Sequence, residues 1–326
     1  METPCVRVPR EDGEQTRADL DDRGLLAHDY EIVVEEDHIY IPVTDPNAVP
    51  ESLSVHTRDV PVRETQTLPE DVLGFDPSYE RLGDVVIIDE DDSERARAIA
   101  DALVESAIPV ETVLNRASKV KGTERLREWE VLHGDSTETV HREYGCSFAL
   151  DVTEVYFSPR LATERHRVVE QVTPDERVLD MFAGVGPFVV PMAAAGATTV
   201  GVDINDRAID YLRENARRNG VADRVTAIAG DVREVTDDYA GWADRLVMNL
   251  PHSADAFLDT AVSLAGDTCR LHYYDIQHED DPYGPGEAAI RSAAEPTYDV
   301  TVETRHSVRS YAPHELNVCL DVVLSR

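Results

Sequence analysis

Four polar side chains in this sequence directly follow or end short apolar runs typical of buried strands. Three of them are carboxyl groups and one is an amide: Asp180, Asp203, Asp231 and Asn249. Open α/β sheets bind ligands beyond the carboxyl ends of their strands. Asp203 could accept hydrogen bonds from ribose hydroxyls, and Asp231 could reach the edge of an adenine. The spacing therefore predicts a nucleotide site at one edge of a sheet.

A glycine-rich turn follows the first of these strands. In "DMFAGVGPF", residues 180–188, Gly184 and Gly186 allow a tight turn and close approach of a ligand to the backbone. The dinucleotide fingerprint GxGxxG fails because Val189 stands where its last glycine should be. A ligand without a pyrophosphate is indicated, and we favour S-adenosylmethionine. We assign Asp180, Phe182 and both glycines to its site. Each strand-end Asp alone is equally typical of a helix cap or turn.

Two further segments contain candidates for chemistry on a second substrate. In "NLPHSA", the amide of Asn249 ends a strand and Pro251 shapes the following loop. In "VYFSPRLATER", residues 155–165, Glu164 lies near the start of a predicted helix. A carboxylate there can be a helix cap or dipole partner, or a general base. Arg160 could pair with the carboxylate of a methionine group. Taken alone, "NLPHSA" is as typical of a capped strand end.

The composition is strongly acidic. Asp and Glu number 65 against 31 Lys and Arg, which gives a net charge of −34, and Lys occurs only at 119 and 121. The regular apolar pattern argues against a disordered acidic chain. We interpret the charge as adaptation to molar salt, where the Debye length falls to about 3 Å. Any RNA site must then be local, as in the cluster Arg116, Lys119, Lys121, Arg125 and Arg127.

Other sequence features exclude several classes of protein. No apolar run is long enough to span a bilayer, and the first residues lack a signal-peptide pattern. We therefore expect a soluble cytoplasmic protein, and a monomer. The four cysteines are widely spaced and form no CxxC, which predicts buried reduced thiols and no metal site.

The order of predicted elements defines the fold class. From Val178 onward, strands alternate with helices, which predicts an α/β fold with a doubly wound, mostly parallel sheet. The last two strand-like runs have no helix between them and should be antiparallel neighbours. We expect N-caps at Ser93, Ser253 and Asn205 or Asp206, and a loop over "HEDDPYGPGE". The predicted domains are a small α+β unit at 1–48, a linker and the start of the middle region at 49–83, a middle α+β subdomain at 84–165, and the sheet domain at 166–326.

Taken together, "VYFSPRLATER", "DMFAGVGPF", "NLPHSA" and "VRSYAPHELNVCLDVVL" resemble the archaeal and eukaryotic tRNA (guanine-37 N1)-methyltransferases. "VKGTERLREWEVLHGD" and "GLLAHDYEIVVEEDHIYIPV" are similar to the segment before the catalytic domain and to the first domain of that family. The resemblance covers nearly the whole chain. It implies a class I, Rossmann-like methyltransferase sheet that uses S-adenosylmethionine and acts on tRNA with G37.

The resemblance also implies roles for individual residues. Glu164 matches the general base that removes the guanine N1 proton, and Arg125 matches the residue that stabilises charge on O6. Because Arg127 is two residues away, either arginine remains a candidate for O6. Asn249 would hold the guanine edge and also lie near the cofactor, and Tyr156 would support the flipped base or the cofactor. The N-terminal domain would contact the tRNA body.

Three alternatives remain open at this point. A related wybutosine-pathway enzyme transfers the aminocarboxypropyl group of S-adenosylmethionine, and the loops "GVGPF" and "NLPHSA" favour methyl transfer over it. A dual-function methyltransferase would also act on a tricyclic guanine derivative at the same tRNA position. A noncatalytic RNA-binding protein with a methyltransferase fold is a different class, and it would not need Glu164, Asn249, Asp203 and the glycine loop together.

Overall fold

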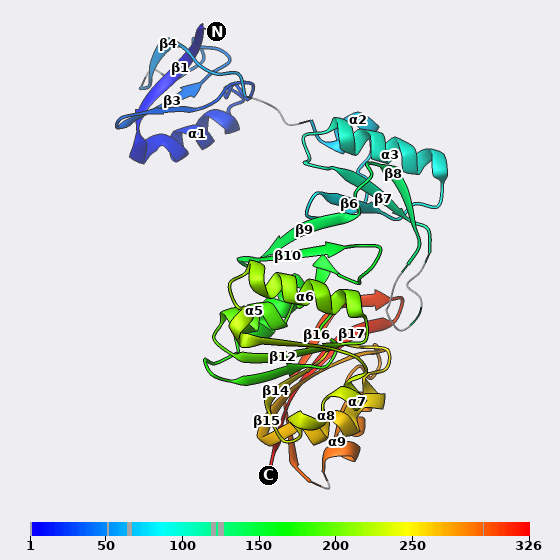
Figure 1. Ribbon diagram of the computed structural model, residues 1–326. Helices are drawn as coiled ribbons and strands as arrows, with labels where there is room; N and C mark the ends of the chain where they lie inside the picture. Colours follow the sequence, from blue (N-terminus) through cyan, green and yellow to red (C-terminus); the bar gives the residue numbers. More distant parts are fainter. Residues whose placement is uncertain (1, 51, 64–66, 119–121, 123–126, 296) are drawn as a thin grey trace. The chain divides into compact units, whose positions relative to one another are not determined.

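A computed structural model describes residues 2–50, 52–63, 67–118, 122, 127–295 and 297–326. The chain forms two compact units (Figure 1). The first comprises residues 1–72 with 105–107, and the second comprises 73–104 and 108–326. Among the described residues, no helix is both long and apolar enough to cross a membrane.

The first unit is a four-stranded antiparallel sheet with one helix. Its strand order is β2-β3-β1-β4, and its elements are β1 (Glu2–Pro9), α1 (Gly13–Asp22), β2 (Val33–Glu35), β3 (His38–Pro42) and β4 (Ser54–Asp59). Both helix and strands are present, as expected for the small α+β unit. The expectation of an irregular linker from residue 49 is wrong for β4, which pairs along β1. This strand carries polar, largely exposed side chains, so the sequence showed no apolar alternation there.

A second, smaller sheet opens the second unit. Its order is β5-β6-β7-β8, formed by β5 (Tyr79–Leu82), β6 (Val85–Ile88), β7 (Thr112–Arg116) and β8 (Trp129–His133). The helix α3 (Ser93–Glu105) connects the parallel strands β6 and β7. Asp92, not Ser93, caps this helix, because its Oδ1 accepts the N–H groups of Glu94 and Arg95, each at 2.9 Å. A short helix, α2 (Pro69–Leu73), precedes β5.

A hairpin leads from this sheet toward the last domain. It consists of β9 (Glu138–Glu143) and β10 (Cys146–Asp151). Its two turn residues, Tyr144 and Gly145, both have positive φ, at 44° and 82°. That is the conformation of a type I′ turn, whose twist matches that of the flanking strands. The buried face of β10 packs on α6 (Asp206–Arg218) through the amide of Asn215, which bonds both backbone groups of Ala149.

The large sheet has seven strands in the order β13-β12-β11-β14-β15-β17-β16. The first five are mutually parallel, and β17 runs antiparallel between β15 and β16, which confirms the predicted strand pair. The strands are β11 (Arg177–Asp180), β12 (Thr198–Asp203), β13 (Val225–Ala229), β14 (Ala243–Met248), β15 (Ala265–His278), β16 (Asp299–Ala312) and β17 (Glu315–Ser325).

Helices cover both faces of this sheet (Figure 1). They are α4 (Ala162–Val169), α5 (Val189–Ala194), α6 (Asp206–Arg218), α7 (Val232–Val235), α8 (Leu258–Leu264) and α9 (Gly284–Ala294), with one-turn 3₁₀ segments at Pro159–Leu161 and Ala254–Phe257. One core includes residues of α8 and α9, and the opposite face has separate cores with α5, α6 and α4. The predicted loop at 278–287 is wrong at its end, because α9 begins at Gly284.

Two further local predictions have different outcomes. Asn205 caps α6 as expected, since its Oδ1 accepts the N–H of Arg207 at 2.9 Å and that of Ala208 at 3.4 Å. Ser253 precedes the 3₁₀ turn before α8, but its side chain makes no capping hydrogen bond there. All four cysteines are buried and free, as the sequence indicated.

Candidate active site at the carboxyl ends of the strands

The strand order places the predicted polar residues along one edge of the sheet. Asp231, Asp203, Asp180 and Asn249 end or follow β13, β12, β11 and β14, which are adjacent in that order. The next strand, β15, pairs Tyr273 with Met248, so Asn249 continues the chain beside Tyr274. One edge of parallel strands therefore carries the whole predicted set.

The glycine turn and Asp203 form one hydrogen-bonded structure. Oδ2 of Asp203 accepts the N–H of Gly184 at 2.7 Å, and Oδ1 accepts the N–H of Asn205 at 2.9 Å. Gly184 and Gly186 have φ of 52° and 91°, in the left-handed region that favours glycine. A Cβ on Gly186 would also lie 2.3 Å from Leu212 Cδ1 of α6. The turn therefore brings backbone close to the strand ends, where a nucleoside could approach it.

Asp180 is buried at the centre of this edge. Its Oδ1 accepts the N–H of Phe182 at 3.1 Å. Burial raises the pKa of Asp180 to about 7; the Phe182 N–H opposes this shift and the negative charge of Asp203 adds to it. A carboxyl with such a pKa is poised to ionise when a cationic group approaches, as the sulfonium and ammonium of S-adenosylmethionine would.

Asp231 lies in a small cluster of rings and charge. Its carboxylate accepts the backbone N–H of Arg233 at 3.0 Å and also the guanidinium of the same residue, which lowers the pKa of Asp231. That guanidinium lies 4.6 Å from the centre of the Phe257 ring. The Phe257 ring in turn meets Phe182 edge-on, with centroids 5.0 Å apart. Aromatic faces beside a hydrogen-bonding carboxylate suit a flat heterocycle.

The Asn249 loop is fixed through its backbone. The carbonyl of Pro251 accepts the N–H of Ile276 in β15 at 3.2 Å, and Leu250 O accepts the N–H of Ser253 at 3.0 Å. Pro251 itself is buried. Within the described part of the chain, the Asn249 side chain makes no hydrogen bond, although its donors and acceptors are partly shielded from solvent. An amide in that state is available to a ligand.

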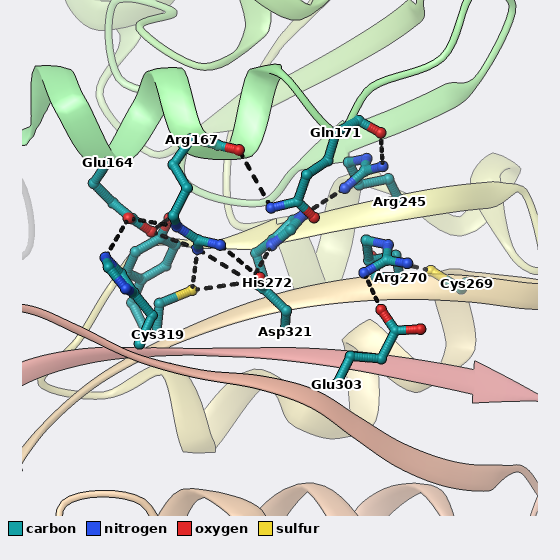
Figure 2. A network of polar contacts seen from close by, with 12 residues as sticks. Glu164, Arg167, Gln171, Arg245, Cys269, Arg270, His272, Glu303, Cys319 and Asp321 are labelled. Carbon is teal, nitrogen blue, oxygen red and sulfur yellow. Dashed lines mark hydrogen bonds and ion pairs between the residues drawn. The ribbon is translucent and has the colours of Figure 1, made fainter.

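Glu164 is buried, and side chains from three elements contact it (Figure 2). Arg167, one turn on in α4, donates Nε–H to Oε2 and Nη2–H to Oε1, both at 2.8 Å. Tyr274 of β15 donates its hydroxyl to Oε1 at 2.8 Å. His306 of β16 lies with Nε2 3.2 Å from Oε2. The carboxylate is therefore held with a defined orientation beside the end of β14.

The remaining predicted residues have different positions. The backbone carbonyl of Tyr156 lies beside the glycine turn, since a Cβ on Gly184 would be 3.9 Å from it. Arg160 is half-exposed and forms an ion pair with Glu80 of β5. Arg125 lies outside the described residues, as do Lys119 and Lys121 of the cation cluster. The alternative, Arg127, is described, with its guanidinium 5.3 Å from the centre of the Trp129 ring.

Several residues near these groups were not found from the sequence. Arg167, Tyr274 and His306 contact Glu164, and Arg233 and Phe257 contact Asp231 or each other. Of these, only the contact of Arg167 with Glu164 could have been predicted from the sequence, because residues three apart on a helix lie on the same face. A surface groove of about 570 Å³ lies elsewhere, at the opposite edge, lined in part by Glu176, Asp244 and Arg270. It contains none of the predicted site residues.

The sheet is doubly wound, its sixth strand is antiparallel, and its glycine turn is bonded to Asp203 at the end of β12. This strand order and these features define a class I methyltransferase fold. Comparisons narrow the class. Residues 139–302 match the TRM5/TYW2 methyltransferase domain, residues 5–51 the tRNA methyltransferase 5 N-terminal domain, and residues 65–137 the TYW2 N-terminal domain. The chain therefore belongs to the TRM5/TYW2 methyltransferase family.

Individual relatives cover most or all of the chain. It is 39% identical over 334 residues to the tRNA (guanine(37)-N(1))-methyltransferase Trm5b of Pyrococcus abyssi, covering 99% of both proteins. A solved complex of aTrm5 with tRNALeu has a TM-score of 0.74 at 31% identity, covering 99% of each chain. A Pyrococcus horikoshii tRNA(Phe) (4-demethylwyosine(37)-C(7)) aminocarboxypropyltransferase is 33% identical, covering 79% of this chain and 93% of that protein.

Proposed function

We propose that this protein transfers the methyl group of S-adenosylmethionine to N1 of guanine 37 in tRNA. The observation that carries the proposal is the position of Glu164. It is a buried carboxylate on α4 that accepts a hydrogen bond from Tyr274 of β15, and β15 pairs with β14, the strand that Asn249 directly follows. Near full-length similarity to a tRNA (guanine(37)-N(1))-methyltransferase supports the choice of substrate.

The cofactor would lie across the ends of β11, β12 and β13. S-adenosylmethionine supplies an electrophilic methyl group on a sulfonium. Asp203 would accept hydrogen bonds from the ribose hydroxyls, while Gly184 and Gly186 leave room beside the backbone. Asp231 and the ring of Phe182 would contact the adenine. Asp180 is the carboxyl nearest the centre of the edge and would face the charged methionine portion, with Arg160 as the partner of its carboxylate.

The target base would enter beside β14 and β15. Guanine N1 carries a proton, so its electron pair becomes nucleophilic only when that proton is removed. Glu164 would accept the proton, and Arg125 would donate to O6, where negative charge develops. Asn249 would hydrogen-bond the guanine edge, Pro251 would keep the loop in place, and Tyr156 would support the flipped base. Extrusion of the base from its stack is required, because the acceptor atom is otherwise enclosed by neighbours.

The aminocarboxypropyl transfer known from other family members is the second candidate. Residues 65–137 match an N-terminal domain named for that branch. Against it, the aminocarboxypropyltransferase of Pyrococcus horikoshii leaves about a fifth of this chain unmatched, since it covers 79%. Residues 5–51 match the N-terminal domain of the methyltransferase branch. We therefore favour methyl transfer. The first unit would contact the tRNA body and recognise the shape of the RNA.

The test is transfer of labelled methyl groups from S-adenosylmethionine to two unmodified tRNA transcripts in high KCl. One transcript carries G37 and its matched control carries A37. The proposal expects label on the G37 transcript alone, released as N1-methylguanosine. Equal labelling of both transcripts, or tight binding of cofactor and tRNA without transfer, would remove it; the second result would identify a noncatalytic RNA-binding protein.

The acidic surface supports a proposal about working conditions. With a net charge of −34, we expect a cytoplasmic monomer adapted to molar salt. Its affinity for tRNA should change by less than about tenfold between moderate and molar KCl. Ordinary counterion release by several phosphate contacts would cost about a thousandfold or more over a fourfold rise in salt. A titration with that steep slope would overturn the halophilic interpretation, and sedimentation of the pure protein would test the monomer.

A further inference from the structure

The contacts of Glu164 are unusual for a general base, because every acceptor position of the carboxylate has a neighbour. An ionised carboxylate offers about four lone-pair positions on its two oxygens. Oε1 receives Arg167 Nη2–H and the Tyr274 hydroxyl, while Oε2 receives Arg167 Nε–H and faces His306 Nε2. The Tyr274 ring is fully buried, whereas the His306 side chain is 38% exposed. A substrate can therefore reach the carboxylate most directly from the His306 side.

Arg167 contacts two carboxylates with two edges of one guanidinium (Figure 2). The edge formed by Nε and Nη2 meets Glu164. Nη1 donates to Oδ2 of Asp321 at 2.6 Å, and Nη2 also donates to Oδ1 at 3.2 Å. Burial opposes the charge of Arg167, but the bonds to both carboxylates outweigh it and raise its pKa. Since the guanidinium is planar and rigid, fixing one edge on Asp321 fixes the other edge under Glu164.

Asp321 is held in turn by a neutral histidine. His272 Nδ1 lies 2.6 Å from Asp321 Oδ1, and its Nε2 lies 2.6 Å from Arg245 Nη1. A guanidinium only donates and an ionised carboxylate only accepts, so His272 must carry its proton on Nδ1 and accept through Nε2. Full burial lowers the pKa of His272 in spite of Asp321, which agrees with the neutral form. Arg245 in turn contacts Glu176, with Arg245 Nε 2.7 Å from Glu176 Oε1, and the network of polar side chains ends there.

A metal site is the competing explanation for part of this cluster. His272, Cys319 and Asp321 each offer a metal-ligand atom within 4.8 Å of the others. However, Asp321 is bonded to Arg167, and the other ring nitrogen of His272 is bonded to Arg245. Two guanidinium groups beside the same donors would repel a cation. The cluster instead satisfies the requirement that buried charges be paired.

We propose that Arg167, fixed by Asp321, is the positioning residue for Glu164: it orients the carboxylate toward the target base through two charge-assisted hydrogen bonds. This inference rests on the proposed function of Glu164. When guanine binds, its N1–H takes the place beside Oε2 that His306 has in the structure. The proton moves to Glu164 as N1 gains the methyl group and the sulfur of the cofactor regains its electron pair. Arg167 does not touch the base and acts through the carboxylate.

The proposal makes a claim about pH, so all charged or titratable neighbours of Glu164 matter. They are Arg167 on the same helix, Tyr274 on β15, His306 on β16, and Cys319 and Asp321 on β17. Arg167 is the cation in direct contact with both oxygens. Removing this cation makes negative charge at that place less favourable, so the loss of rate should be larger at acid than at alkaline pH.

The experiment measures single-turnover methyl transfer to G37 tRNA across pH for five variants. In Arg167→Gln the rate should fall about a hundredfold at about pH 6 and recover to within about tenfold of wild type at about pH 9. Arg167→Lys keeps the charge but loses the paired geometry, so its rate should fall about tenfold with the acid limb unmoved. Asp321→Asn should behave like Arg167→Lys, because the guanidinium is then charged but loosely held.

The matched control is Arg177→Gln. Arg177 makes the same two-bond contact with a carboxylate, to Asp244 at 2.6 and 2.9 Å, at the start of β11. Its rate should stay within about twofold of wild type at every pH. Unfolding temperature and cofactor affinity are measured for every variant. If Arg167→Gln does not fold, Arg167→Lys decides between positioning and simple structural support.

Each result has a defined meaning. An equal loss of rate at every pH in Arg167→Gln, tracking its loss of stability, overturns the positioning role. So does a wild-type rate in Arg167→Lys. If Glu164→Gln is inactive while Arg167→Gln has the wild-type profile, the positioning role falls and the base assignment stands. If Glu164→Gln keeps the wild-type rate, the base assignment itself falls, and the role of Arg167 with it.

Discussion

Asp180 and Glu164 are buried carboxyl groups in the same domain, but they have different partners. Asp180 accepts one backbone N–H, and its nearest charged neighbour is another carboxylate, Asp203. Glu164 is bonded to a guanidinium and a hydroxyl and faces an imidazole. The first environment raises the pKa of Asp180 to about 7, while the second supplies positive charge from the protein. We therefore expect a cationic ligand to complete the environment of Asp180, whereas the protein itself supplies the cation beside Glu164.

This difference follows from where each residue lies. The cofactor end is formed by turns that directly follow β11, β12 and β13, so its hydrogen bonds come mainly from nearby backbone N–H groups. The target end requires α4, β15, β16 and β17 to meet, and its bonds join side chains distant in sequence. We therefore expect substitutions at the two ends to affect different steps of the reaction.

The largest effect should come from Glu164→Gln. Glutamine keeps the shape but cannot accept the N1 proton, so the single-turnover rate should fall about 10²- to 10⁴-fold. Cofactor affinity should change by less than about twofold, because we assign Glu164 only to the part of the site that binds the target base. Rapid-quench transfer and equilibrium titration measure the two quantities. Glu170→Gln, an exposed change just after α4, is the matched control. A wild-type rate in Glu164→Gln would contradict the role of base.

Asp203→Asn should have a smaller effect, and it should weaken cofactor binding rather than slow methyl transfer. The carboxylate bonds the N–H groups of Gly184 and Asn205 and would meet the ribose. Bonds to a charged group contribute about 1.5–3 kcal/mol, so cofactor affinity should fall about 10- to 100-fold. Asp210→Asn on the exposed side of α6 controls for the change in charge. If Asp203→Asn binds the cofactor normally, the assigned ribose contact is wrong.

Asn249 is assigned both to the target base and to the cofactor, so Asn249→Ala tests which of the two it contacts. Loss of one base-edge contact should lower kcat/KM for tRNA about tenfold at saturating cofactor. His252→Ala, in the same loop but exposed, is a control for the loop itself. Steady-state rates against tRNA concentration provide the comparison. An effect confined to cofactor affinity would move Asn249 wholly to the cofactor end.

The last effect concerns Asp180, and it appears in the free energy of unfolding rather than in catalysis. Burial raises its folded pKa to about 7, above the usual value of 3.8 for this side chain. Between these values the unfolded chain loses a proton that the folded chain retains, so wild-type stability falls as pH rises through this window. Asp180→Asn removes this pH dependence of stability. Relative to wild type, it should therefore gain stability from about pH 4 to about pH 7, by about 1 kcal/mol per pH unit at most.

Urea unfolding of both proteins at several pH values measures this difference. Added cofactor should reduce it, since a cation beside Asp180 favours ionisation. A constant stability difference from acid to neutral pH would mean that folding does not raise the pKa of Asp180, and the contrast with Glu164 would disappear.

The sequence predicted those parts of the site that have local signatures. A polar residue after an apolar strand identified Asp203, Asp231 and Asn249, and a glycine turn before a helix identified Gly184 and Gly186. The strand order then aligned them, as expected for a parallel sheet. Asn205 was recognisable as a cap because capping involves only the next few residues.

The rest depended on contacts between distant segments. Tyr274 is 110 residues from Glu164, and Asp321 is 154 residues from Arg167. Nothing in the spacing of either pair indicates contact, since it arises from the order in which β15, β17 and β16 join the sheet. The strand β4 was missed for a related reason: it is largely exposed, so pairing with β1 defines it rather than an apolar pattern.

The central claim is that this edge of the sheet delivers a methyl group to G37. It is tested most directly by one reaction run with two preparations of S-adenosylmethionine, labelled either in the methyl group or in the aminocarboxypropyl group. The account predicts that label enters the G37 transcript from the first preparation alone, as N1-methylguanosine. Label entering the tRNA from the second preparation, without methylation, would contradict it and assign the chain to aminocarboxypropyl transfer.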